Sequence, residues 1–231
     1  MTIDTGDLLG SILASLDRIK YIEPEDIPGI DLYMDQVTSF MDRRLRSTSR
    51  YPGEDRTLTK TMINNYAKND LIPPPVTKKY SKEHILLLLF IYYFKGILSI
   101  GDIQALLAPI TSQYFQNGEE FNLESIYNEV IQMEKAQFDS MKEDVIRKYR
   151  ESEETFQNAP EEGRDFLQKF AFICMLSYDV YVKKLMIEKM IDEMAKQNAA
   201  AGTPGGKKGG EKSPGKKEAG KKEATKKETI S

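Results

Sequence analysis

The chain is poor in the residues on which most metal sites and hydrolytic active sites depend. Its 231 residues include one cysteine, one histidine and no tryptophan. A single cysteine excludes an internal disulfide, and so few cysteines and histidines exclude the clusters that bind zinc. A catalytic histidine needs an orienting partner, and none is identifiable for His84, which is expected to be a surface or capping residue beside a helix start. The sequence therefore predicts no enzyme, no metal and no cofactor.

Long hydrophobic runs are missing as well. The apolar stretch from Ile85 to Phe94 has ten residues, about half of what a transmembrane helix needs, and is expected to be a buried core helix. No basic segment followed by an apolar region of signal-peptide length stands at the N-terminus. We expect a cytoplasmic protein without membrane contact. The thiol of Cys174, which follows Phe172 and Ile173, is expected to be a small buried hydrophobic side chain.

The charge is unevenly distributed along the chain. The composition, 40% hydrophobic and 30% charged, fits one or two globular domains with a tail. Residues 31–82 contain ten basic and six acidic side chains, residues 83–195 contain 11 and 20, and residues 196–231 contain ten lysines and four glutamates. The excess of basic charge in residues 31–82 and in the tail marks where a polyanion would bind.

Apolar residues recur at helical spacing through most of the chain. Residues 8–20 predict a short amphipathic helix that belongs, with a connector, to a packing arm over residues 1–30. Ser81, Ser99 and Asn122 are suited to N-cap further helices. The connection 47–57 is longer than an ordinary helix-turn-helix turn, so the sequence predicts either an expanded turn at Tyr51-Pro52-Gly53 or a different arrangement of the first helix. The other helices are expected over 31–46, 59–69, 82–94 and 122–150. A last helix is expected to start at Ala159-Pro160-Glu161-Glu162 and to continue from Phe166 to Met194.

The helix predicted from Thr59 to Asn69 has two chemically different faces. One face is apolar or aromatic and consists of Met62, Ile63, Tyr66 and Ala67. The opposite face can donate and accept hydrogen bonds and consists of Thr61, Asn64, Asn65 and Lys68. Three prolines, 73–75, forbid further helix and lead into the basic stretch Thr77-Lys78-Lys79-Tyr80.

This order of segments resembles the DNA-reading head of the MerR-type winged helix-turn-helix regulators. The resemblance rests on Asn65-Tyr66-Ala67-Lys68-Asn69-Asp70-Leu71-Ile72-Pro73-Pro74, on the wing-like Lys78-Lys79-Tyr80-Ser81, and on Leu98-Ser99-Ile100-Gly101-Asp102-Ile103. The longer segment from Tyr33 to Leu107 is similar to an uncharacterised bacterial family, domain of unknown function 1836, whose members are regarded as transcriptional regulators. The resemblance implies a regulatory role and no established chemistry.

A DNA-reading head assigns two kinds of contact to these residues. The base contacts would come from Thr61, Asn64 and Asn65, since asparagine is suited to bidentate contact with adenine. The phosphate contacts would come from basic and tyrosine side chains on either side of that helix. Arginines at the end of a helix are also favoured by the helix dipole alone, and both interpretations of them stay open. The phosphate set is Arg43, Arg44, Arg46, Lys60, Tyr66, Lys68, Lys78, Lys79 and Tyr80.

The second half of the chain predicts long helices and then a tail. Residues 113–197 form a helical accessory domain that dimerises or binds an effector, a small molecule or a protein, because the residues from Phe166 to Met190 include more apolar side chains than one helix can bury without a partner. Residues 198–231 repeat small residues and lysines and cannot bury enough surface to fold, so they should be disordered. This tail is either an electrostatic arm for nucleic acid or a solubilising extension.

The sequence thus predicts a mainly α protein with a winged helix-turn-helix-like head over residues 31–112, a minimal wing, a helical accessory domain and a disordered Lys-rich tail. The predicted function is sequence-specific binding of double-stranded DNA by a homodimeric transcriptional regulator, with residues 59–69 in the major groove. Two alternatives stay open, since a fold does not establish a function. They are a helical protein-interaction module that keeps the fold without specific DNA binding, and a sensor whose helical domain binds an apolar ligand.

Overall fold

The computed structural model describes residues 5–19, 21–48 and 57–200. Within these ranges the chain is mainly helical, as predicted, with one two-stranded antiparallel sheet. Short 3-10 helices occupy Pro24–Asp26 (η1) and Arg46–Thr48 (η2). The other elements are α1 (Thr5–Leu16), β1 (Leu32–Tyr33), α2 (Met34–Leu45), α3 (Lys60–Lys68), β2 (Lys79–Tyr80), α4 (Lys82–Phe94), α5 (Ile100–Tyr114), α6 (Leu123–Glu153) and α7 (Glu161–Ala200).

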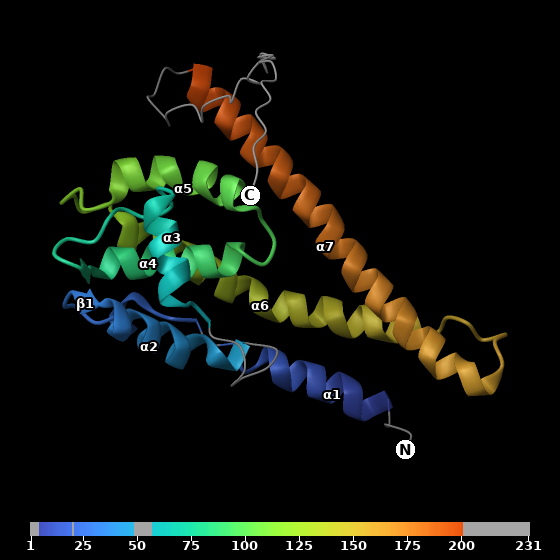
Figure 1. The fold of residues 1–231 in the computed structure, drawn as a ribbon. Coiled ribbons are helices and arrows are strands. Elements are labelled where there is room, and N and C mark those ends of the chain that lie inside the picture. The colour runs from blue at the N-terminus through green and yellow to red at the C-terminus, as the bar shows by residue number, and fades with distance from the viewer. Residues whose placement is uncertain (1–4, 20, 49–56, 201–231) are drawn as a thin grey trace, which may run out of the picture.

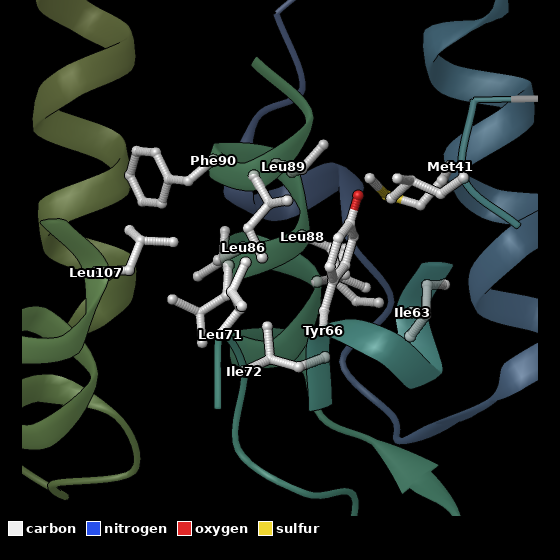
Figure 2. Packing of buried hydrophobic residues seen from close by; sticks show 14 of the residues in the cluster. Met41, Ile63, Tyr66, Leu71, Ile72, Leu86, Leu88, Leu89, Phe90 and Leu107 are labelled. Carbon is white, nitrogen blue, oxygen red and sulfur yellow. The ribbon is translucent and has the colours of Figure 1, made fainter. Parts of the chain in front are cut away.

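Helix α4 lies at the centre of the core, as its uninterrupted apolar sequence predicts. Every residue from His84 to Ile91 is buried, so the helix has no solvent face over these two turns. A helix that is apolar all round must be covered on all sides. Figure 2 shows how Met41 of α2, Ile63 and Tyr66 of α3, and Leu107 of α5 gather around it.

The predicted helix starts are confirmed by their capping groups. Ser99 Oγ accepts from the Asp102 backbone N–H at 3.2 Å, and the Asp102 carboxylate accepts from the Ser99 N–H at 3.2 Å. Asn122 accepts from the N–H groups of Glu124 and Ser125 at 3.0 and 3.1 Å. Such caps satisfy donors that a helix leaves unpaired in its first turn. Ser81 is the N-cap of α4, where the His84 imidazole at the third position accepts from the Ser81 N–H at 3.0 Å.

The long helices α6 and α7 enclose an angle, and α7 runs from the far end of α6 back toward α5 (Figure 1). The first turns of α6 belong to the core through Leu123, Tyr127 and Ile131. Tyr127 packs edge-on against Phe90 with ring centroids 5.3 Å apart and donates a hydrogen bond to the Ile22 carbonyl at 3.0 Å. The core therefore includes residues on both sides of position 112, where the predicted head ends and the predicted helical accessory domain begins.

The N-terminal arm lies along α6 and therefore packs on its own chain. Helix α1 contacts α6, and Asp17 after α1 forms an ion pair with Lys142 of α6. Glu23, closer to the core, forms a second ion pair with Lys135. The arm covers a helix of its own chain.

Two sequence predictions differ from the structure, and two concern residues that lie mostly or wholly outside the described ranges. Helix α2 begins at Met34 and not at 31, because Leu32 and Tyr33 pair with residues 79–80 as strand β1. The prediction that Cys174 is buried is wrong, since α7 stands away from the core at this point and the thiol is exposed. The turn proposed at residues 51–53 lies outside the described residues. Of the tail 198–231, predicted to be disordered, residues 198–200 continue α7 and the rest lies outside the described residues.

None of the helices in the described ranges has the length and apolar content required to cross a membrane.

We expect replacement of Leu88 by alanine to destabilise the fold strongly. Leu88 has no exposed surface, and truncation of a fully buried leucine costs about 2–5 kcal/mol of unfolding free energy. Urea denaturation measures this directly. Ile100→Ala is the matched control, because Ile100 is 46% exposed and its truncation should change stability by less than about 0.5 kcal/mol. Equal effects of the two changes would contradict the central position of α4.

Candidate nucleic-acid interface

Helix α3 presents the two faces that its sequence predicts. Ile63 and Tyr66 are buried, and Met62 and Ala67 are half-buried against the core. On the opposite side the helix is exposed to solvent, and none of its own side chains on that side is acidic. Within the described residues, the side chains of Thr61, Asn64 and Asn65 form no hydrogen bond with the protein. The exposed face consists of Lys60, Thr61, Asn64, Asn65 and Lys68.

Local hydrogen bonds fix both ends of α3. Thr59 Oγ1 accepts from the Met62 N–H at 3.2 Å and caps the start. At the end, Asp70 adopts a left-handed conformation with φ of 56°, and the Leu71 N–H donates to the Tyr66 carbonyl at 2.9 Å. A helix of nine residues is unstable alone, so these caps and the buried side chains of the inner face hold the polar face in place.

A tight hairpin follows α3 and stands where a wing is expected. Thr77 and Lys78 both have positive φ, 49° and 64°, and the Lys79 N–H donates to the Val76 carbonyl at 2.9 Å. Two consecutive residues with positive φ define the two-residue turn that suits a hairpin. Lys79 and Tyr80 then pair with Tyr33 and Leu32 of β1. The turn raises Lys78 into solvent.

Three of the predicted phosphate ligands are already paired with carboxylates. Lys60 forms an ion pair with Asp35 at the start of α2. Arg44 contacts Asp26 at 3.0 Å, and Arg46 contacts Asp42 at 2.7 Å. All three pairs are largely exposed, and exposed ion pairs contribute only about 0–1 kcal/mol. A phosphate could therefore compete for these cations, but they do not form an open basic surface.

The structure divides the predicted phosphate ligands into two groups. Lys60, Lys78 and Lys79 lie near the start of α2, because Lys60 reaches Asp35 and the Lys79 ammonium lies 5.3 Å from the centre of the Tyr33 ring. The arginines lie at the other end of α2, about 15 Å away at 1.5 Å per residue. Arg43 and Lys68 are exposed.

The two predicted tyrosine contacts belong to the core and not to the surface. Tyr66 is 6% exposed and Tyr80 is 3% exposed, and burial raises the pKa of each hydroxyl. Their rings pack among the apolar side chains around α4, and the Tyr80 ring meets His84 edge-on at 5.5 Å. The rings therefore belong to the core, and phosphate contact by the two hydroxyls stays a prediction.

His84 is a capping residue, as one of its two predicted roles states, but it is not on the surface. Its Nδ1 accepts from the Ser81 N–H at 3.0 Å, and its ring lies between Tyr80 and Phe115 with 2% of the residue exposed. Burial lowers the pKa of the imidazole. The nearby Pro73 and Pro74 carbonyls oppose this shift without reaching hydrogen-bond geometry with Nε2.

Residues 22–130 match the family model described as Domain of unknown function (DUF1836). This DUF1836 segment extends from the end of the N-terminal arm into the first turns of α6, and so includes α2, α3, the hairpin, α4 and α5. The resemblance to this family that residues 33–107 predict is thus confirmed. No curated protein and no solved structure matches the chain. The likeness to MerR-type regulators stays a prediction.

The sequence did not indicate which acidic residues pair with the cations of the DUF1836 segment. Asp35 and Lys60 are 25 positions apart, and Asp26 and Arg44 are 18 apart, so neither pair follows from helical spacing. Asp42 and Arg46, by contrast, are four residues apart on one helix, a spacing that predicts contact. Within the described residues, no group of three or more His, Cys, Asp and Glu side chains could hold a metal ion.

We expect His84 to make the fold sensitive to mild acid. Its folded-state pKa lies below the unfolded value of about 6.5, so the unfolded chain takes up the proton first. The free energy of unfolding should not depend on His84 well above pH 6.5. Below pH 6.5 it should decrease, by at most about 1.4 kcal/mol per pH unit.

His84→Gln provides the comparison, since glutamine at this position can still accept from Ser81 N–H but does not titrate. Urea denaturation between pH 7.5 and 5.5 should show wild type losing stability relative to the variant. A constant difference across this range would exclude the neutral buried imidazole.

Proposed function

We propose that the chain is a cytoplasmic DNA-binding protein, without enzymatic activity, that regulates transcription as a homodimer and recognises specific sites with α3. The observation that carries the proposal is the outer face of α3, where five neighbouring side chains are all hydrogen-bonding or basic and none is acidic. Thr61, Asn64 and Asn65 are unused by the protein fold within the described residues. A face of this kind matches the donor and acceptor groups of base edges in the major groove.

The dimensions of α3 support this role. An α-helix with its side chains is about 10–12 Å wide, which is close to the width of the major groove of B-DNA. Nine residues extend about 13 Å along the axis, enough for three or four base pairs. Because Ile63 and Tyr66 anchor the inner face, the outer face can approach DNA without any rearrangement of the core.

Phosphate contacts would come from basic side chains on α2, α3 and the hairpin. Lys78 at the hairpin turn, Lys68 at the end of α3 and Arg43 on α2 are exposed, and none of them has an ion pair with another described residue. Lys60 and Lys79 are available at the cost of an exposed ion pair and a ring contact. Phosphate contacts fix the orientation of a protein on DNA, whereas base contacts decide the sequence.

A protein-interaction module is the second candidate, and one specific observation favours it. Asp35, Asp26 and Asp42 neutralise three of the predicted phosphate ligands, so the basic surface between the end of α2 and the hairpin is interrupted. A surface with alternating charges fits a protein partner better than a uniform polyanion.

The two sets of DNA contacts should separate in a binding experiment. We expect Asn64→Ala together with Asn65→Ala to reduce discrimination between preferred and random DNA by about 1–3 kcal/mol for each lost bidentate contact. Lys78→Gln together with Lys79→Gln should weaken binding to all DNA and lower the slope of log K against log salt by about 2. Fluorescence anisotropy over a salt series measures both quantities.

Lys169→Gln on α7 is the control for charge alone, because Lys169 is remote from α3 in sequence and pairs with Asp165 of its own helix. This variant should bind like wild type. If the asparagine and lysine variants affect specific and random DNA in the same way, the roles assigned to the two sets are wrong.

The Lys-rich tail can be tested in the same assay with a chain that ends at Gln197. We expect the shortened chain to keep its preference for particular fragments and to lose part of its salt-dependent affinity. If only the chain with the tail binds DNA, and without preference, α3 does not read sequence and the protein-interaction module becomes the better assignment.

A further inference from the structure

Helix α7 exposes an apolar surface that no other described element covers. We call it the α7 band, and its seven large side chains are between 47% and 69% exposed. At 3.6 residues per turn the band occupies an arc of about 160° and a length of about 30 Å. Contiguous apolar patches of this size mark interaction sites. The band consists of Phe166, Phe170, Ile173, Cys174, Ser177, Tyr178, Val180, Tyr181 and Leu185.

The band is almost free of charge. Of the acidic and basic residues between 166 and 185, Lys184 alone falls within its arc, and its ammonium lies 3.6 Å from the Glu188 carboxylate. This ion pair stands at the C-terminal edge of the band. A surface without charge of its own does not select a strongly charged partner.

Contacts at two distant points hold the band in a fixed position. Near its start, Phe172 packs edge-on against Tyr149 of α6 at 5.3 Å, and Asp179 forms an ion pair with the buried Lys148. Near the other end of α7, Ile191 is buried in the core cluster. A rigid, preformed surface loses little conformational entropy when a partner binds.

The residues outside the described ranges offer few apolar side chains that could cover the band. Outside the described ranges there are only four large apolar side chains, those of Met1, Ile3, Tyr51 and Ile230. An anionic membrane surface is a poor partner too, because a helix that binds there carries basic residues on its polar face, whereas residues 161–180 contain four acidic and two basic side chains.

We propose that a second copy of the chain covers the α7 band, with the two α7 helices antiparallel and the two-fold axis between Met175 and Leu176. This centre brings the two bands into full overlap, since Phe166 of one copy comes level with Leu185 of the other and Phe170 with Tyr181. An isologous contact of this kind is the commonest arrangement in soluble oligomers. The proposal names the interface of the homodimer and stands independently of DNA binding.

Charge and area both suit this arrangement. Residues 161–175 carry three acidic and two basic side chains, and residues 176–190, which come level with them in the partner copy, carry two acidic and three basic ones. The antiparallel pair therefore places a half of net −1 beside a half of net +1. The two helix dipoles also point in opposite directions.

The area of the band is large enough for a stable interface. Aromatic side chains carry about 150–250 Å² of surface each, so the band buries roughly 600 Å² per copy. The total for two copies reaches the lower limit of about 1,200 Å² for a stable interface.

Sedimentation equilibrium of the full chain without DNA tests the surface. Wild type should be a dimer, and Phe170→Glu with Tyr181→Glu should weaken self-association at least tenfold, because it places four carboxylates in the overlap. Both side chains are exposed in one copy, so circular dichroism should show an unchanged fold. Met186→Glu, an exposed residue on the far side of the same helix, should stay dimeric. A monomeric wild type, or dissociation by Met186→Glu alone, would overturn the proposal.

The lone cysteine tests the register and the direction of the pair. With helix axes about 8–10 Å apart, the two Cys174 thiols lie close enough for a short bis-maleimide reagent to join two chains, and a single cysteine per chain allows no other product. In a Cys174→Ser, Leu185→Cys variant the two thiols would be about 28 Å apart along the helices, and no cross-link should form. Cross-linking of that variant, or none in wild type, would contradict the antiparallel arrangement.

Discussion

The burial of α4 on all sides is the constraint from which the rest of the structure follows. A helix whose eight central residues are all buried must be enclosed by other elements, and α2, α3, α5 and α6 supply that enclosure. The same requirement places His84 in an apolar environment, where the imidazole is held neutral by burial and not by any chemical task. The core thus explains the one histidine in the chain without reference to function.

The outer face of α3 is free for recognition because its inner face does the packing. Ile63 and Tyr66 anchor the helix, so no side chain on the outer face is needed to hold it. The acidic partners of Lys60, Arg44 and Arg46 limit how basic this side of the molecule is. Recognition of DNA would therefore depend more on hydrogen bonds from α3 than on a strong general attraction to phosphate.

Features that depend on short-range pattern could be predicted from the sequence, and features that depend on distant contacts could not. The buried run of α4, the two faces of α3 and the caps at Ser99 and Asn122 follow from spacing and local chemistry, and the structure has them. The pairing of β1 with β2 involves two residues per strand, too few to give a periodic signal. The burial of Cys174 is wrongly predicted because its apolar neighbours indicate a core position, whereas α7 stands away from the core there.

The two anchor points of α7 restrict changes in its length. Phe172 is fixed to α6 and Ile191 to the core, and 18 residues of uninterrupted helix lie between them. One inserted residue would rotate everything beyond it by about 100° and move it by about 1.5 Å, so the two anchors could no longer be satisfied together. Between these positions the helix can accept many substitutions on its outer side, whereas insertions and deletions should be rejected.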